Sequence, residues 1–284
     1  MGTYLRPTSL NDALDALRAN PCVILAGGTD FYPARVGRAL DEDILDITAL
    51  ADLRGGADNG DRCRIGALTT WTDIVEAPLP ACSDGLKLAA REVGGVQIQN
   101  AGTVAGNLCN ASPAADGVPP LLALDAEVEL SSAEGPRLLP LSDFVTGNRT
   151  TVRRPDEVLT AIRVPKRPDA AVSTFLKLGS RKYLVISIVM VAVTLEPADG
   201  AVERVSIAVG ACSPVAQRLT ALERDLVGVP LSGALAGRVT AVHIDAALSP
   251  IDDIRGSGDY RRDSALALVR RALAAAEAQI GGSA

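Results

Sequence analysis

The chain has 284 residues, of which 48% are hydrophobic and 3% aromatic, and its formal net charge at pH 7 is −6. This length suits one large or two ordinary domains with a sizeable core, and the composition argues against a disordered chain. The acidic balance and the lack of a basic tract argue against nucleic acid or an anionic membrane as a partner.

No stretch is typical of export or of a membrane span. Residues 1–21 lack an apolar h-region, and the most apolar run, 183–195, is too short and too β-branched to cross a bilayer, so it predicts a buried strand. The five cysteines are scattered, without a Cys-x-x-Cys pair. We therefore expect buried reduced thiols, a cytoplasmic location and no metal site in this chain alone.

The first part of the chain predicts a small α/β unit ending near residue 56. An edge strand is expected over 3–5, followed by a helix that Ser9 caps, with Asp12 three residues later. Short strands are expected over 23–26 and 43–47.

A glycine turn, Gly27-Gly28-Thr29, follows the first of these strands. Successive backbone N–H groups in such a turn form a nest that binds anions, so the turn suggests a phosphate site. Asp30 would repel a phosphate, and we expect it to point away or to cap the next segment. A plain tight turn is the alternative interpretation.

The second unit is predicted to run from residue 57 to the linker at 165–168. Strands are expected over 62–67, 126–130, 138–140 and 158–164, with helices after Thr70 and over 86–93. Residues 97–124 lie between them and combine glycines, amides, Thr103 and Asp116 before an apolar run. We expect a loop that wraps a polar ligand, with a short helix beginning at Pro119-Pro120.

From residue 169 the pattern predicts an antiparallel sheet with helices on one face. Long strands are expected over 175–178, 184–195 and 202–209, with a hairpin turn at 197–200. Residues 217–227 and 231–248 are expected to be helical or partly so, and a final helix spans roughly 260–280. His243, the only histidine, is interpreted as structural.

A second glycine turn, Gly102-Thr103-Val-Ala-Gly106-Asn107, is followed by Asn110-Ala-Ser-Pro-Ala-Ala-Asp116. Together with Ala26-Gly-Gly-Thr-Asp30, and in this order, it resembles the FAD-binding loops of the medium subunit in the xanthine dehydrogenase/CO dehydrogenase family of molybdenum hydroxylases. The resemblance continues through residues 156–165, 175–177, 210–214 and 254–262. It implies an α+β fold: a two-subdomain FAD-binding domain of PCMH/VAO type over 1–168, with subdomains of about 1–56 and 57–168. An α+β domain over 169–284, like the C-terminal domain of the CO dehydrogenase flavoprotein, would follow.

The resemblance also implies the FAD contacts. The backbone of 24–31 would receive the pyrophosphate, Thr103 and Gly106 would continue the cradle, and Asn107 would order the loop. Asp116 suits a hydroxyl or an adenine amine, and Lys177 would offset phosphate or reduced-flavin charge unless it is a solvated strand lysine. The complete set is Ile24, Leu25, Ala26, Gly27, Gly28, Thr29, Asp30, Phe31, Val93, Gly102, Thr103, Gly106, Asn107, Asn110, Asp116, Leu159 and Lys177.

Many relatives carry an acid followed by an aromatic or aliphatic residue after the lysine, near the flavin ring. Here the stretch is Tyr183-Leu184-Val185-Ile186, without the acid. The residue that faces the flavin and the final oxidant therefore stay open. Tyr183 is either a ring contact or a core tyrosine.

The implied function is an electron-transfer oxidoreductase subunit without catalytic residues of its own. FAD would accept electrons from two [2Fe–2S] clusters of a small partner and pass them to an external acceptor. A large partner would carry the molybdenum cofactor and hydroxylate the substrate, in a dimer of heterotrimers. The alternatives are a self-contained VAO-type flavin oxidase and a scaffold that has lost FAD.

Overall fold

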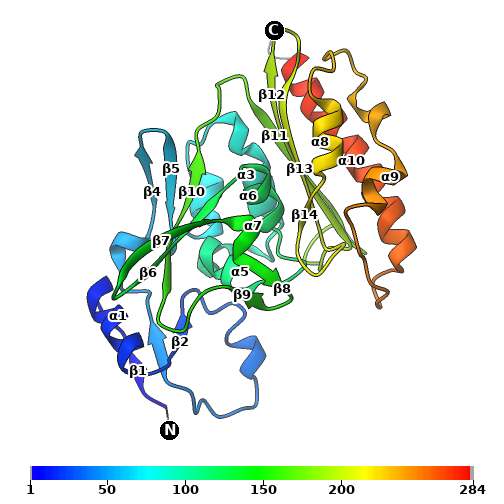
Figure 1. The fold of residues 1–284 in the computed structure, drawn as a ribbon. Coiled ribbons are helices and arrows are strands. Elements are labelled where there is room, and N and C mark those ends of the chain that lie inside the picture. Colours follow the sequence, from blue (N-terminus) through cyan, green and yellow to red (C-terminus); the bar gives the residue numbers. More distant parts are fainter. Residues whose placement is uncertain (1, 282–284) are drawn as a thin grey trace.

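The computed structural model describes residues 2–281. The fold of these residues is α+β, with three larger sheets, one two-stranded sheet and a long C-terminal helix (Figure 1). The N-terminal sheet is parallel, in the order β1-β3-β2, with β1 at Tyr4–Leu5, β2 at Val23–Leu25 and β3 at Ile44–Asp46. Helix α1, Leu10–Ala19, covers it and begins as predicted, because the Ser9 hydroxyl oxygen accepts from the Asp12 backbone N–H at 3.2 Å.

The second sheet is antiparallel, in the order β4-β5-β10-β6-β7. Its strands are β4 Gly56–Asn59, β5 Arg62–Gly66, β6 Glu127–Ser132, β7 Gly135–Pro140 and β10 Val158–Pro165. The sequence analysis missed β4, which is rich in Gly, Asp and Asn and forms only as the hairpin partner of β5. A short hairpin, β8 Val145–Gly147 and β9 Thr150–Thr151, precedes β10.

Helices cluster beside the second sheet, and residues 97–124 are mostly helical rather than a loop. These helices are α2 Trp71–Glu76, α3 Asp84–Glu92, α4 Val96–Ala101, α5 Val104–Asn110, α6 Val118–Ala123 and α7 Leu141–Phe144. Four 3-10 turns complete the chain: η1 Pro33–Arg35, η2 Ala51–Leu53, η3 Ala81–Ser83 and η4 Leu235–Arg238.

The third sheet is antiparallel, in the order β11-β12-β13-β14, with β11 Val172–Leu178, β12 Val189–Ala198, β13 Ala201–Gly210 and β14 Gln217–Arg218. Helices α8 Thr220–Leu226, α9 Ala241–Asp245 and α10 Gly258–Gly281 follow. Figure 1 shows these helices on one side of the sheet and α3 and α6 on the other. The sheet is therefore buried on both faces, one of them against the first half of the chain.

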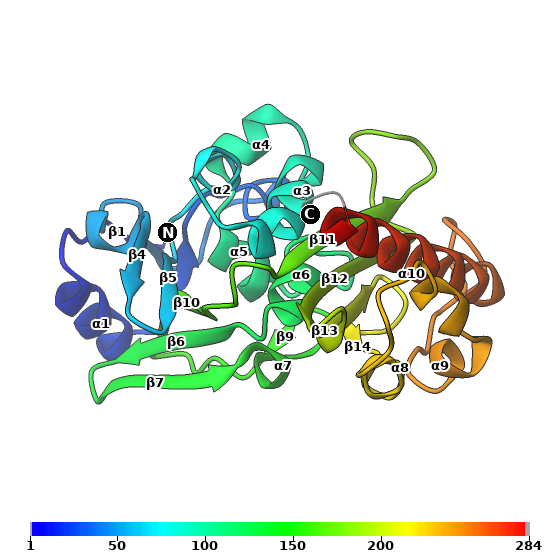
Figure 2. The same cartoon turned by 90° about the horizontal axis from the view of Figure 1, so that it is seen from above.

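One predicted strand begins later than expected. Residues 183–188 form the end of a loop that projects beyond β11 (Figure 2), and β12 starts at Val189. Tyr183 is 64% exposed and Ile186 is 53% exposed, so the prediction of a buried strand from Tyr183 was wrong. Tyr183, Leu184 and Ile186 of this loop therefore do not pack in the core, whereas Ile188 at its end does.

Within residues 2–281, no helix is both long and apolar enough to cross a membrane.

Candidate functional site

The first glycine turn leaves β2 with its backbone donors open. Gly28 has φ +71°, a conformation that L side chains rarely adopt, and a Cβ there would lie 2.6 Å from the Tyr32 ring. Within the described chain, the N–H groups of Gly28, Thr29 and Asp30 donate to no protein acceptor. A turn with a left-handed residue and free amides is the geometry of an anion-binding nest.

The two glycine turns contact each other directly. A Cβ on Gly27 would lie 1.9 Å from the Ala101 carbonyl oxygen and 3.0 Å from the Gly102 α-carbon. Gly27 thus has a packing role that no other residue can fill without moving backbone. Segments about 75 residues apart in the chain form one continuous wall.

The second turn is an ordered helix start. The Thr103 hydroxyl oxygen caps α5 by accepting from the Gly106 N–H at 3.0 Å. The Trp71 N–H donates to the Gly102 carbonyl at 3.1 Å, and the Asn107 side-chain oxygen accepts from the Gly117 N–H at 3.3 Å. Because its N–H donates to Thr103, Gly106 has no free donor for a ligand. Its lack of a side chain instead lets a ligand approach the backbone closely.

These turns line one cleft of about 900 Å³, at the upper end of the range of ligand pockets. The predicted contacts Gly28 and Thr103 both lie on its wall. So do most of the others: Ile24, Leu25, Ala26, Gly27, Thr29, Asp30, Phe31, Val93, Gly102, Gly106, Asn107, Asn110 and Leu159. The Asp30 side chain does not cap η1; its Oδ2 accepts from the Asn110 side-chain amide at 2.7 Å.

Asp116 and Lys177 lie outside the lining and form a buried ion pair, with 2.8 Å between Lys177 Nζ and Asp116 Oδ2. Lys177 also donates to the Glu92 carbonyl at 3.2 Å, and the Ser187 hydroxyl donates to Asp116 at 2.9 Å. Burial raises the pKa of Asp116 and Lys177 opposes that shift. The pair joins β11 to the end of α3, next to Val93 in the cleft wall, and Lys177 carries no spare charge.

The sequence analysis missed three arginines of the cleft, Arg35, Arg149 and Arg153. Arg35 pairs with Glu42 at 2.7 Å, and its guanidinium carbon lies 3.9 Å from the centre of the Phe31 ring. The only sequence signal for Arg149 and Arg153 is the arginine-rich stretch 149–154 in an otherwise acidic chain, and this stretch matches none of the family segments named above. Trp71 and Cys109 also line the cleft and were not predicted.

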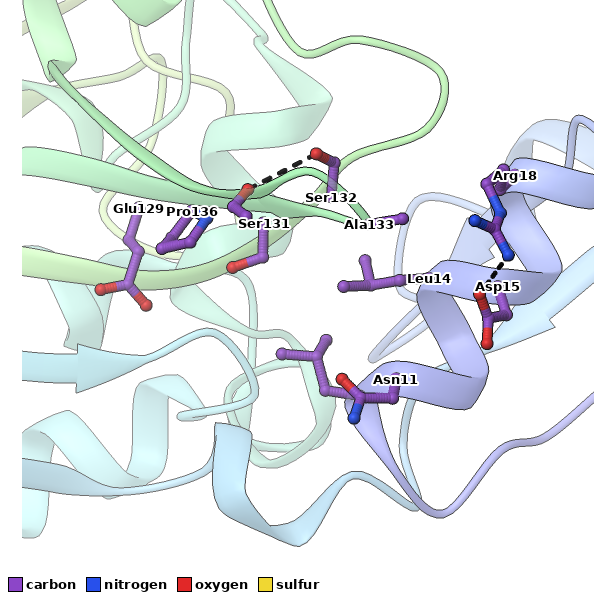
Figure 3. A pocket seen from close by; sticks show the side chains of 11 residues that line it. Asn11, Leu14, Asp15, Arg18, Glu129, Ser131, Ser132, Ala133 and Pro136 are labelled. Carbon is purple, nitrogen blue, oxygen red and sulfur yellow. Dashed lines mark hydrogen bonds and ion pairs between the residues drawn. The ribbon is translucent and has the colours of Figure 1, made fainter.

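A second cavity of about 620 Å³ lies between α1 and the β6–β7 hairpin (Figure 3). Its charged groups already have partners. Arg18 pairs with Asp15 at 2.9 Å on the same helix, and Glu129 pairs with Arg163 and Arg64. It therefore offers no unpaired charge to a ligand.

Among residues 2–281, no three His, Cys, Asp or Glu side chains are grouped to hold a metal ion. His243 lies outside the cleft, where its Nδ1 accepts from the Thr240 N–H at 3.1 Å and its Nε2 lies 3.1 Å from Asp225. The interpretation of His243 as structural agrees with these local contacts.

Comparison with known proteins gives two family matches. Residues 1–167 match the FAD binding domain in molybdopterin dehydrogenase, and residues 174–276 match the CO dehydrogenase flavoprotein C-terminal domain. The chain is 32% identical to a putative xanthine dehydrogenase FAD-binding subunit of Escherichia coli (strain K12), covering 99% of this chain and 97% of that protein.

Further relatives include the carbon monoxide dehydrogenase medium chain of Hydrogenophaga pseudoflava, which is 29% identical with 97% of each chain covered. Among solved structures, reconstituted CO dehydrogenase from Oligotropha carboxidovorans matches with a TM-score of 0.91, 29% identity and 98% of each chain covered. Quinoline 2-oxidoreductase from Pseudomonas putida 86 matches with a TM-score of 0.90 and 25% identity, covering 99% of this chain and 98% of that one.

Proposed function

Because the chain belongs to the family of FAD-binding flavoprotein subunits of molybdopterin dehydrogenases, we propose that it holds FAD in the 900 Å³ cleft and carries electrons. Electrons would arrive from [2Fe–2S] clusters of a partner subunit and leave to an external acceptor. FAD supplies the redox chemistry, and this chain binds and orients it.

The observation that carries the proposal is the pair of touching glycine turns. Gly28, Thr29 and Asp30 present free amides, and Gly27 is pressed against the Ala101 carbonyl with no room for a side chain. A diphosphate needs such donors at close range. We propose all the cleft residues predicted from the sequence as FAD contacts, with Asp116 and Lys177 acting from behind the wall as positioning residues.

The chemistry of the cleft favours an electron carrier over a self-contained oxidase. Among the residues that the structure describes, Asp30 is the only carboxylate of the lining, and the single histidine lies elsewhere. General acid–base catalysis on a substrate would need a positioned proton carrier. Cys109 lines the cleft and is where a covalent flavin link of an oxidase would form, so flavin that resists acid release would favour that alternative.

The relatives are named as subunits of larger enzymes, and we propose the corresponding assembly for this chain. A large molybdenum-cofactor subunit and a small iron–sulfur subunit would join it in a dimer of heterotrimers in the cytoplasm. We propose residues 1–168 as the FAD-binding domain and 169–284 as the C-terminal domain.

The test is Gly28→Asp in the purified chain. The substitution places a carboxylate and a strained left-handed backbone where the diphosphate lies, so the folded variant should retain no FAD. Gly237→Asp is the matched control, because Gly237 is exposed and a Cβ there meets nothing within 4 Å. Bound flavin is measured by absorbance after gel filtration.

Wild-type chain and the control should bind FAD in equal amounts. A folded Gly28→Asp protein with normal flavin content would contradict the placement of FAD, and wild-type chain that takes up no FAD would support the scaffold alternative.

A further inference from the structure

The β8–β9 hairpin and the segment that follows it each bring one arginine to the cleft, from a part of the chain that neither glycine turn includes. The Arg149 N–H donates to the Ala111 carbonyl at 2.8 Å, which fixes the hairpin to the end of α5. Its side chain donates to Asn110, to the carbonyl at 3.4 Å and to the amide oxygen more closely. The backbone anchor holds the Arg149 guanidinium at the cleft wall.

Arg153 reaches the same cleft at the entry to β10. Its Nη1 donates to the carbonyl oxygens of Arg154 at 2.9 Å and Glu157 at 2.7 Å. Over residues 2–281, neither Arg149 nor Arg153 has a carboxylate within ion-pair distance. Both therefore keep a full positive charge that only neutral groups contact.

The other charges of the cleft are already engaged. Glu42 neutralises Arg35, and Lys177 is paired with Asp116 behind the wall. Asp30 is held by the amide nitrogen of Asn110, whose oxygen accepts from Arg149. One carboxylate therefore faces two uncompensated guanidinium groups, in a chain whose net charge is −6.

We propose that Arg149 and Arg153 bind the diphosphate of the nucleotide, the cationic complement to the open amides of the Gly27–Asp30 turn. This inference rests on the proposed FAD function. Diphosphate is the anionic part of FAD, and guanidinium groups match phosphate oxygens with paired hydrogen bonds. Asn110 keeps the Asp30 carboxylate engaged and so limits its repulsion of the diphosphate.

The experiment compares ligands with and without the diphosphate. Dissociation constants for FAD and riboflavin are measured by flavin fluorescence on flavin-free wild-type chain, Arg149→Ala and Arg153→Ala. Each variant should weaken FAD binding about tenfold, the loss of one charge-assisted hydrogen bond, and change riboflavin binding less than about twofold. Arg149→Lys, which keeps the charge, should recover part of the loss.

Arg18→Ala is the matched control, since it removes the same charge from an exposed pair on α1 and should leave both constants unchanged. Folding of every variant is checked by circular dichroism. Unchanged FAD affinity in folded Arg149→Ala and Arg153→Ala would overturn the inference, as would an equal loss of FAD and riboflavin. Wild-type chain that binds neither flavin would instead refute the proposed function.

Discussion

Two groups of arginines in this protein differ in the partners of their side chains. In the cleft, Arg149 and Arg153 contact only neutral groups. Where the two halves of the chain meet, Arg167, Arg204 and Arg218 surround Asp125. An arginine that pairs with a carboxylate stabilises the fold, whereas an arginine that contacts only neutral groups can bind an anionic ligand.

The junction cluster is closely paired. Arg167 is 4% exposed and donates to Glu196 at 2.8 Å and to Asp125, while Arg218 donates to Asp125 at 2.8 Å. Burial raises the pKa of Asp125, but hydrogen bonds from Arg218 and Arg167 outweigh it and hold that pKa below its usual value. This cluster links α6 to the third sheet.

The largest effect is expected for Asp125→Asn, which tests whether the junction cluster stabilises the fold without affecting FAD binding. Asparagine tolerates the left-handed φ of +51° at this position, so the change removes charge without strain. Removing one of the two carboxylates that pair with the buried Arg167, a carboxylate that also bonds Arg218, should lower the free energy of unfolding by about 3 kcal/mol, measured by urea denaturation. FAD affinity of the folded protein should stay the same, and a selective loss of FAD would mean that the two clusters are not separate.

A smaller effect is expected at Asp253, which pairs with the buried Arg261 at 2.7 Å. Burial acts to raise the Asp253 pKa, but the Arg255 N–H and the Arg261 and Arg255 side chains lower it from 3.8 to about 2. A depressed carboxyl pKa stabilises the fold above the unfolded value of 3.8, and this contribution is lost as pH falls toward 2.

Asp253→Asn should therefore cost about 2 kcal/mol near neutral pH and flatten the fall in stability between the unfolded and folded pKa values. Unfolding free energies across that acid range, for wild type and variant, measure it. Parallel pH profiles for the two proteins would show that Asp253 is not the titrating group.

The smallest stability effect belongs to Arg149→Ala. Its side chain is exposed and bonds only Asn110, so the flavin-free chain should lose less than about 0.5 kcal/mol. Urea denaturation beside the FAD titration tests whether affinity and stability separate at this residue. A loss of unfolding free energy as large as that of Asp125→Asn would show that Arg149 mainly stabilises the fold.

Local signals predicted much of the framework. The Ser9 cap, the Thr70 cap and the strands over 158–164 and 202–209 all correspond to observed elements. The turn at 197–200 forms the predicted hairpin, with Asp199 and Gly200 at positive φ. The contacts that determine the two caps and the hairpin turn lie within a few residues of one another.

Features that depend on distant contacts were not predictable. Residues 96–110 are poor in strong helix formers, yet α4 and α5 form where Gly27 contacts Ala101 and Trp71 bonds Gly102. Arg149 reaches the cleft because its backbone bonds Ala111, 38 residues away along the chain. The pairing of Lys177 with Asp116, across 61 residues, was likewise not predicted.

The contact of Gly27 with the Ala101 carbonyl has a consequence for maturation of the protein. The rear wall of the cleft consists of two backbone segments in direct contact, so its shape is established when the polypeptide folds. We therefore expect the dinucleotide to enter a pocket whose rear wall is already formed.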